Sequence, residues 1–145
     1  MTGDAGYGRS DRVGDPAVVQ QVFEQLPMMA AALAGTDLRY VAVNGATRVF
    51  ACRDRMLGRP LMEAVPEVAG QRVHAVYREV LTSGRPQSLR EWRARLDVPG
   101  SGPVEIFVDI DVTPWRDHDG EVAGVIVTAV DVTERVRERQ AAQER

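Results

Sequence analysis

The residues best suited to chemistry in this chain are two carboxylates, Asp109 and Asp111, on a stretch of alternating apolar and polar residues. A carboxylate held in an apolar pocket can act as a general base, because burial raises its pKa towards neutrality. Such a base would suit a small α+β enzyme of the isomerase or dehydratase kind. The alternation, however, places both carboxylates opposite the apolar side of their strand. An enzyme is therefore the most remote of the functions considered, and we assign no catalytic residue.

The numbers of cysteine, lysine and histidine residues exclude several classes of functional site. Cys52 is the only cysteine, so the chain can form no internal disulfide and no cysteine-based zinc cluster. All 18 basic residues are arginine, and without lysine a Walker-type phosphate loop and a Schiff-base nucleophile are excluded. The two histidines, His74 and His118, are too scattered to make a metal site. We therefore expect no metal centre.

Length and composition predict one domain. The chain has 145 residues, of which 44% are hydrophobic, and this suffices for a single core. The net charge of −3, with no basic stripe, argues against nucleic acid or an anionic membrane as a partner. No apolar run approaches the ~20 residues of a membrane span, and the polar N-terminal segment does not resemble a signal peptide. We expect residues 1–14 to be disordered and the protein to be cytoplasmic.

The stretch expected to organise the fold is 121–139. Residues 122–132 are nearly all small or apolar, which predicts a central strand buried on both faces. Asp131 can cap a following helical turn, and Glu134 can reach back to it as in a capping box. A helix should therefore leave the strand without a loop and occupy 134–145. This helix is charged, so it needs a partner or a continuation to be stable.

Another helix is expected near the start of the chain, over 15–27. Asp15 can cap it, and proline at position 16 suits the first helical residue. Four apolar residues share one face of this helix at i, i+3, i+4 and i+7 spacing, namely Val19, Val22, Phe23 and Leu26. That face either packs on the core or serves as a dimerisation helix, and the sequence leaves both interpretations open.

Between these two helices the pattern predicts strands and helices in separate groups. The expected elements are a hairpin over 28–34 and 38–43, a helix over 45–51 capped by Asn44, short helical turns over 53–68, a longer helix over 71–83, and strands over 89–98 and 104–112. Such segregation predicts an α+β domain with an antiparallel sheet and helices packed on one face. We take 28–133 as its core.

The two alternating strands can be aligned from their apolar faces. If those faces coincide, Val98 pairs with Val104, and the same register places Arg93 opposite Asp109. The polar face is then either a solvated surface with weak ion pairs or a polar wall that binds a charged ligand or partner.

Four motifs occur in order with compatible spacing: 37–44 (DLRYVAVN), 57–60 (LGRP), 114–120 (PWRDHDG) and 131–135 (DVTER). Together they resemble the PAS family of sensory domains over about 17–135. The last motif is similar to the family's Asp-x-Thr junction, at which the sheet passes into a signalling helix. The resemblance implies a PAS fold of five antiparallel strands, with the first and last strands adjacent at the centre.

The resemblance also implies a function, that of a sensory module in a bacterial signalling protein such as a two-component system. It is similar to the PAS domains that precede actinobacterial histidine kinases or PP2C-type phosphatases, and the chain itself has no room for such an effector. In this interpretation Asp131, Thr133 and Glu134 relay a change in the sheet to the exit helix within a homodimer. The alternative is a ligand-free PAS domain for dimerisation or protein interaction.

The cofactor expectations follow from the same resemblance. Flavin-bonding relatives use a cysteine in an Asn-Cys-Arg-Phe-Leu-Gln-like motif, a context that Cys52 lacks, and haem-binding relatives place a histidine on the long helix. His74 lies on that helix without the family's motif, so it is a remote haem candidate, and we expect neither haem nor flavin. The usual ligand cavity lies between the short helices and the sheet. Its expected wall consists of Phe50, Met56, Leu57, Tyr77 and Trp92, which would suit a small apolar or aromatic ligand.

Overall fold

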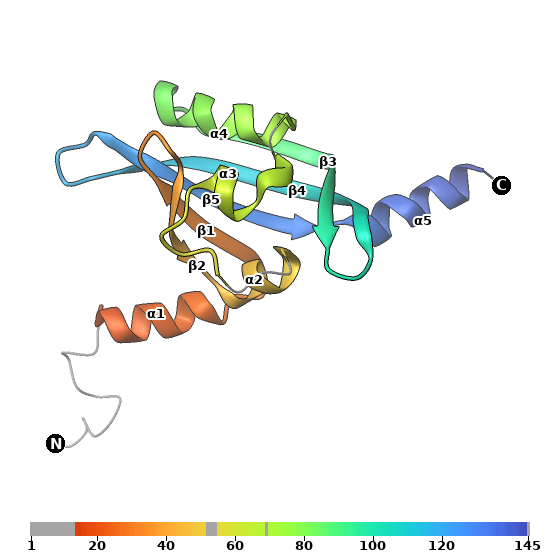
Figure 1. Cartoon of the computed structure of the whole chain (residues 1–145), viewed down its shortest axis with the longest axis horizontal. Helices are drawn as coiled ribbons and strands as arrows, with labels where there is room; N and C mark the ends of the chain where they lie inside the picture. Colours follow the sequence, from red (N-terminus) through yellow and green to blue (C-terminus); the bar gives the residue numbers. More distant parts are fainter. Residues whose placement is uncertain (1–13, 52–54, 69, 145) are drawn as a thin grey trace, which may run out of the picture.

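The strand predicted to be central does lie at the centre of the sheet (Figure 1). The structure is a computed structural model that describes residues 14–51, 55–68 and 70–144. Its strands are β1 (Met29–Ala34), β2 (Arg39–Val43), β3 (Gln87–Val98), β4 (Gly102–Arg116) and β5 (Val122–Asp131). All neighbours are antiparallel in the order β2-β1-β5-β4-β3, which confirms the predicted fold class and the adjacency of the first and last strands.

The helices divide into a covering layer and two peripheral helices. They are α1 (Pro16–Glu24), α2 (Gly45–Ala51), α3 (Leu61–Ala64), the 3-10 turn η4 (Pro66–Val68), α4 (Arg72–Ser83) and α5 (Thr133–Gln143). Figure 1 shows α2, α3 and α4 over one face of the sheet, with α1 and α5 extending outwards at its margins. The core lies between the sheet and this helical layer.

The pairing of β1 with β5 requires a glycine. Gly124 lies opposite Ala34, and a Cβ at Gly124 would be only 2.1 Å from the carbonyl oxygen of Leu33. Any side chain there would push the two strands apart. The close contact explains a glycine in the middle of an otherwise β-branched strand.

One prediction about β5 is wrong, because only one of its faces is covered. Val125, Val127 and Ala129 are buried under the helices, whereas Ile126 and Val130 are exposed on the other face. Small and apolar residues on both faces of a strand therefore do not show that both faces are buried. Here the face of the sheet that the helices leave open carries the exposed apolar side chains of Ile126 and Val130.

The predicted register of β3 against β4 is also wrong, by two residues. Val98 pairs with Gly102, not with Val104, and Arg93 lies opposite Phe107, not opposite Asp109. The prediction assumed a five-residue turn, whereas the chain reverses over residues 99–101, with left-handed backbone at Gly100 and Gly102. A shift of two residues keeps every side chain on its predicted face, so the apolar alternation could not reveal it.

A β-bulge interrupts the alternation of β3. Leu89 pairs with Ile110 and Trp92 with Val108, so two residues of β3 face one residue of β4. The second bulged residue, Glu91, has φ of 50°, a left-handed conformation that is costly for a non-glycine residue. Asp109 supports it, since its Oδ1 accepts the Glu91 N–H at 2.8 Å.

Candidate functional site

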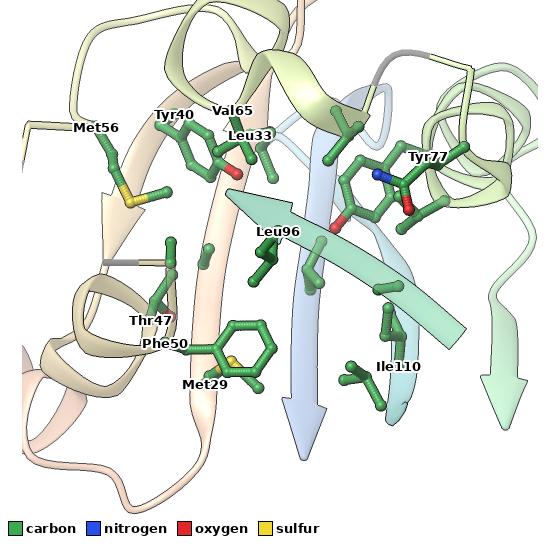
Figure 2. Close-up of a pocket in the computed structure, with 18 of the residues that line it drawn as sticks. Met29, Leu33, Tyr40, Thr47, Phe50, Met56, Val65, Tyr77, Leu96 and Ile110 are labelled. Carbon is green, nitrogen blue, oxygen red and sulfur yellow. The ribbon is translucent and has the colours of Figure 1, made fainter. Parts of the chain in front are cut away.

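An apolar cavity of about 110 Å³ lies between the helical layer and the sheet (Figure 2). It is lined by residues of β1, β2, α2, α4, β3, β4 and β5, including four aromatic side chains, namely Tyr40, Phe50, Tyr77 and Trp92. The volume is of the order of the ~150 Å³ cavity that holds benzene in an engineered protein. The space suits one ring or a short branched chain.

The structure brings together most of the residues expected to form this wall. Phe50, Met56, Tyr77 and Trp92 line the cavity, and Figure 2 shows the first three around it. Leu57 does not, contrary to expectation, because its side chain is 58% exposed and lies beside α1 in a different hollow. Met56 is buried, whereas Leu57, which directly precedes a turn with left-handed backbone at Gly58 (φ of 81°), is exposed.

A buried asparagine fixes the α2 end of the cavity. Asn44 is fully buried, and its Oδ1 accepts the N–H groups of Ala30 at 3.1 Å and Thr47 at 3.0 Å. Its Nδ2 donates to the Met28 carbonyl at 2.8 Å, while the Thr47 hydroxyl lies 2.7 Å from Oδ1. The sequence predicted a helix cap here, and the same side chain also binds β1. We call this set of contacts around Asn44 the Asn44 clip.

Gln71, which lines the cavity, and Glu67 of η4 bind backbone groups of the edge strand β3. Gln71 donates to the Arg95 carbonyl at 3.2 Å and accepts the Arg95 N–H at 3.3 Å. The Glu67 carboxylate accepts the N–H of Asp97 at 3.0 Å. These bonds satisfy edge-strand groups that another strand would otherwise use. No pattern in the sequence pointed to them, because each joins residues more than twenty positions apart.

Tyr77 brings an unused polar group into the cavity. Its side chain is buried, and within the described chain its hydroxyl has no hydrogen-bond partner. Burial, followed by the nearby Tyr40, raises the pKa of Tyr77, so the phenol stays protonated and can donate. Figure 2 shows the hydroxyl oxygens of Tyr40 and Tyr77 both turned towards the interior. An unsatisfied buried hydroxyl is costly and invites an acceptor.

A polar hollow adjoins the cavity, and the two share Gln71, Trp92 and Arg95 in their linings. The charged side chains of this hollow are Arg72, Arg93, Arg95 and Glu105. Arg93 pairs with Glu105 at 3.4 Å, but among the described residues neither Arg72 nor Arg95 has an ion-pair partner. The hollow therefore carries excess positive charge next to an apolar space.

The exit helix is joined to the sheet without a loop, as the Asp-x-Thr motif implied. The N–H of Val132 donates to the Phe107 carbonyl at 2.8 Å, and the Thr133 hydroxyl accepts the Phe107 N–H at 2.9 Å. Asp131 Oδ1 accepts the Thr133 N–H at 2.9 Å. The cap position itself is Val132, and the expected capping box does not form because the Glu134 side chain bonds to no described residue.

A cluster of charges holds α5 to the β3 bulge, and we call it the Glu91 clamp. Arg139 donates to both Glu91 carboxylate oxygens, at 2.5 Å and 2.9 Å, while Arg135 lies 3.4 Å from both Glu91 and Asp109. Hydrogen bonding to Arg139 is the main reason why the pKa of Glu91 is lowered. The sequence analysis missed this contact, since Glu91 and Arg139 lie 48 positions apart.

The remaining candidate residues lie outside the cavity. Asp109 and Asp111 are on the open face, where Asp111 binds Arg90 at 2.6 Å, so neither can act as a base in the apolar space. His74 accepts a bond from Arg78 at 3.3 Å and does not line the cavity, while His118 is exposed. Cys52 lies outside the described residues.

The apolar stripe predicted on α1 is partly exposed. Val19 and Val22 are among the exposed large hydrophobic side chains, while Phe23 and Leu26 are half-buried. Val19 and Phe23 share a hollow with Val41 and Leu57, and Glu24 forms an ion pair with Arg48 of α2. The stripe is thus neither wholly buried nor wholly exposed, and its role as a dimerisation helix stays a prediction.

Within 14–51, 55–68 and 70–144, no helix is long and apolar enough to cross a membrane. Over the same ranges, no group of three or more His, Cys, Asp or Glu side chains is placed to hold a metal ion.

Several solved structures are similar to this chain. An RNA-binding light-oxygen-voltage receptor is 20% identical with a TM-score of 0.70, over 94% of this chain and 38% of that one. Vibrio cholerae VqmA in complex with a ligand and DNA is 23% identical with a TM-score of 0.62, over 80% and 50%. A sensor histidine kinase from Vibrio cholerae is 20% identical with a TM-score of 0.56, over 92% and 97%.

These similarities show the fold, and the chain spans no more than half the length of the first two proteins. A family profile described as "PAS fold" matches residues 23–137, which is most of the chain. The matched region contains the five-stranded sheet, the cavity and the start of α5. The resemblance seen in the four sequence motifs is therefore confirmed, and this chain belongs to the PAS family of sensory domains.

Proposed function

We propose that this chain is a sensory module in which occupancy of the apolar cavity alters the hold of the Glu91 clamp on α5. The observation that carries the proposal is the adjacency of Trp92 and Glu91 at the β3 bulge. Trp92 lines the cavity, and Glu91 binds Arg135 and Arg139 on the exit helix. A ligand that displaces Trp92 would move the strained residue that holds α5.

The proposal adds a second connection to the one expected at the strand–helix junction. Asp131 binds the first residue of α5, Thr133, which in turn binds Phe107 of β4, while the Glu91 clamp binds Arg135 in the first turn of α5 and Arg139 in the second. The junction would then act as a hinge and the clamp would set the helix angle. Glu134, which is exposed, would contact a partner and not the sheet.

The wider setting follows from the family. We propose that α5 passes the signal to an effector such as a histidine kinase or phosphatase, in the cytoplasm and within a homodimer. The low net charge favours a protein effector over nucleic acid, although VqmA, a structural neighbour, is described in complex with DNA. No flavin or haem is part of the proposal, because the aromatic cavity is small and His74 lies outside it.

Hydrogen exchange of the α5 amides tests the relay. Ala94→Val adds volume to the cavity wall beside Trp92, and we expect severalfold faster exchange over residues 134–143. Glu91→Gln should have the same effect by breaking the clamp directly. The matched controls are Val49→Ile, at an exposed position of α2, and Glu63→Gln on α3, which breaks an exposed ion pair with Arg59, and both should change nothing in α5.

The two variants separate the steps of the relay. If Glu91→Gln loosens α5 but Ala94→Val does not, the cavity is not connected to the exit helix and the proposal fails. Circular dichroism of both variants checks that the fold is retained.

A second candidate function is dimerisation without a ligand, and the exposed stripe of α1 favours it. Val19 and Val22 are exposed beside the apolar hollow that contains Val41 and Leu57. Sedimentation of the double variant Val19→Asp, Val22→Asp tests this function, since a dimer held by α1 should become monomeric. An unchanged oligomeric state would exclude α1 as the interface.

A further inference from the structure

The cavity and the adjoining hollow differ in chemistry yet share a wall. The cavity is apolar with four aromatic side chains, and the hollow is lined by arginines with one compensating carboxylate. Gln71, Trp92 and Arg95 belong to both linings. A molecule that fills the cavity and extends past Trp92 would therefore enter the arginine-lined hollow.

The positive charge of the hollow indicates which chemical group of a ligand would bind there. Arg72 and Arg95 have no ion-pair partner within the described chain, and the Arg93 charge is balanced by Glu105. Guanidinium groups bind carboxylates with paired, charge-assisted hydrogen bonds. Two unpaired arginines beside an apolar opening favour an anionic end group over a neutral one.

The lining of the cavity indicates the chemistry of the other part of the ligand. A ring can stack or make edge contacts with Phe50, Tyr77 and Trp92, and the cavity volume allows one ring. The buried Tyr77 hydroxyl, which has no hydrogen-bond partner in the described chain, can donate to an oxygen substituent of that ring. A polar atom at that place would remove the cost of an unsatisfied buried group.

We infer that the ligand is a single-ring aromatic carboxylate, with its ring in the cavity and its carboxylate between Arg72 and Arg95. An oxygen substituent on the opposite edge of the ring binds Tyr77. This inference rests on the proposed sensory function and specifies the ligand class of the same site. It turns the general expectation of an apolar or aromatic ligand into a defined chemistry.

Titration calorimetry with four probes tests the inference on the intact chain. The probes are 4-hydroxybenzoate, benzoate, the neutral isostere benzamide, and acetate, which carries the charge without the ring. We expect benzoate to bind about tenfold more tightly than benzamide, which corresponds to one charge-assisted interaction. 4-hydroxybenzoate should bind more tightly than benzoate, and acetate should not bind measurably.

Three variants assign the parts of the site. The double variant Arg72→Gln, Arg95→Gln should abolish the preference for benzoate over benzamide, while Arg85→Gln, at the far end of α4, should preserve it. Tyr77→Phe should abolish the advantage of 4-hydroxybenzoate over benzoate and leave benzoate affinity unchanged. Equal binding of benzamide and benzoate, or equal binding of acetate and benzoate, would overturn the inference.

The outcome is distinguishable from a failure of the sensory proposal. If no aromatic carboxylate binds while Ala94→Val still loosens α5, the ligand class is wrong and the relay stands. If benzoate binds with the predicted arginine dependence but α5 exchange does not change, the ligand class stands and the relay is wrong.

Discussion

Two polar clusters each hold a helix to the sheet, and they do so in opposite ways. The Asn44 clip is uncharged and centred on a fully buried side chain whose polar atoms are satisfied, and it fixes α2 against β1. The Glu91 clamp is largely exposed and ionic, and it fixes α5 against the β3 bulge. A buried satisfied network is rigid and costly to open, whereas exposed ion pairs exchange readily with water.

The difference suits the two helices to different roles in the proposed relay. The clip would keep α2, which contributes to the cavity wall, in place whether or not the cavity is occupied. The clamp would hold α5 only weakly, so that a small change at the bulge could release it. The proposed sensor needs both properties.

The largest effect is expected from removing the Asn44 clip. Asn44→Ala leaves the partly buried Thr47 N–H and Met28 carbonyl without their partner. We expect a loss of about 2 kcal/mol in the free energy of unfolding, because an unsatisfied buried group costs ~1–3 kcal/mol and partial burial lowers that cost. Urea denaturation measures this loss. Thr47→Val, which keeps the volume but removes the hydroxyl, should cost less. The comparison fails if Asn44→Ala is the milder of the two.

An intermediate effect is expected at the strand–helix junction. Asp131→Ala removes the side-chain acceptor of the Thr133 N–H, and the typical worth of such a cap is about 1 kcal/mol. The fold should remain nearly intact, since the side chain of Asp131 is exposed. Hydrogen exchange should accelerate over 132–140. Unchanged protection there would show that Thr133 and Val132 hold the junction without Asp131.

The fold could be predicted from the sequence because its signals are local. The apolar run over 122–132 identified the central strand, and the spacing of Val73, Val76 and Tyr77 identified α4. The same locality explains the errors. Alternation fixes which face a residue occupies but not its partner, so it could not detect the three-residue turn or the bulge at Glu91.

Some parts of the candidate site could also be predicted from the sequence, and others could not. Phe50, Tyr77 and Trp92 were predictable because aromatic residues at core spacing face the interior. The contacts of Gln71 with Arg95 and of Glu91 with Arg139 were not, since each depends on where two distant segments meet. Hydrophobicity likewise did not report the outward position of Leu57, which lies in the turn before Gly58.

The smallest effect on stability, yet the most diagnostic for the comparison, should come from pH and salt. The pKa of Glu91 is lowered in the folded protein, chiefly by its hydrogen bond to Arg139, from an unperturbed value of 4.5. The clamp is therefore fully formed above about pH 4.5 and is lost as the pH falls through the lower, folded-state pKa, because the folded form must then take up a proton. Protection factors of the α5 amides, corrected for intrinsic exchange, should fall over that interval and also on raising the salt concentration from ~0.05 to ~0.5 M. The α2 amides, held by the uncharged Asn44 clip, should keep their protection under both conditions. In the Glu91→Gln variant the α5 amides should have low protection from the start and respond little to pH or salt. A full response in that variant would show that other charges cause the effect, and the distinction between the Asn44 clip and the Glu91 clamp would then be lost.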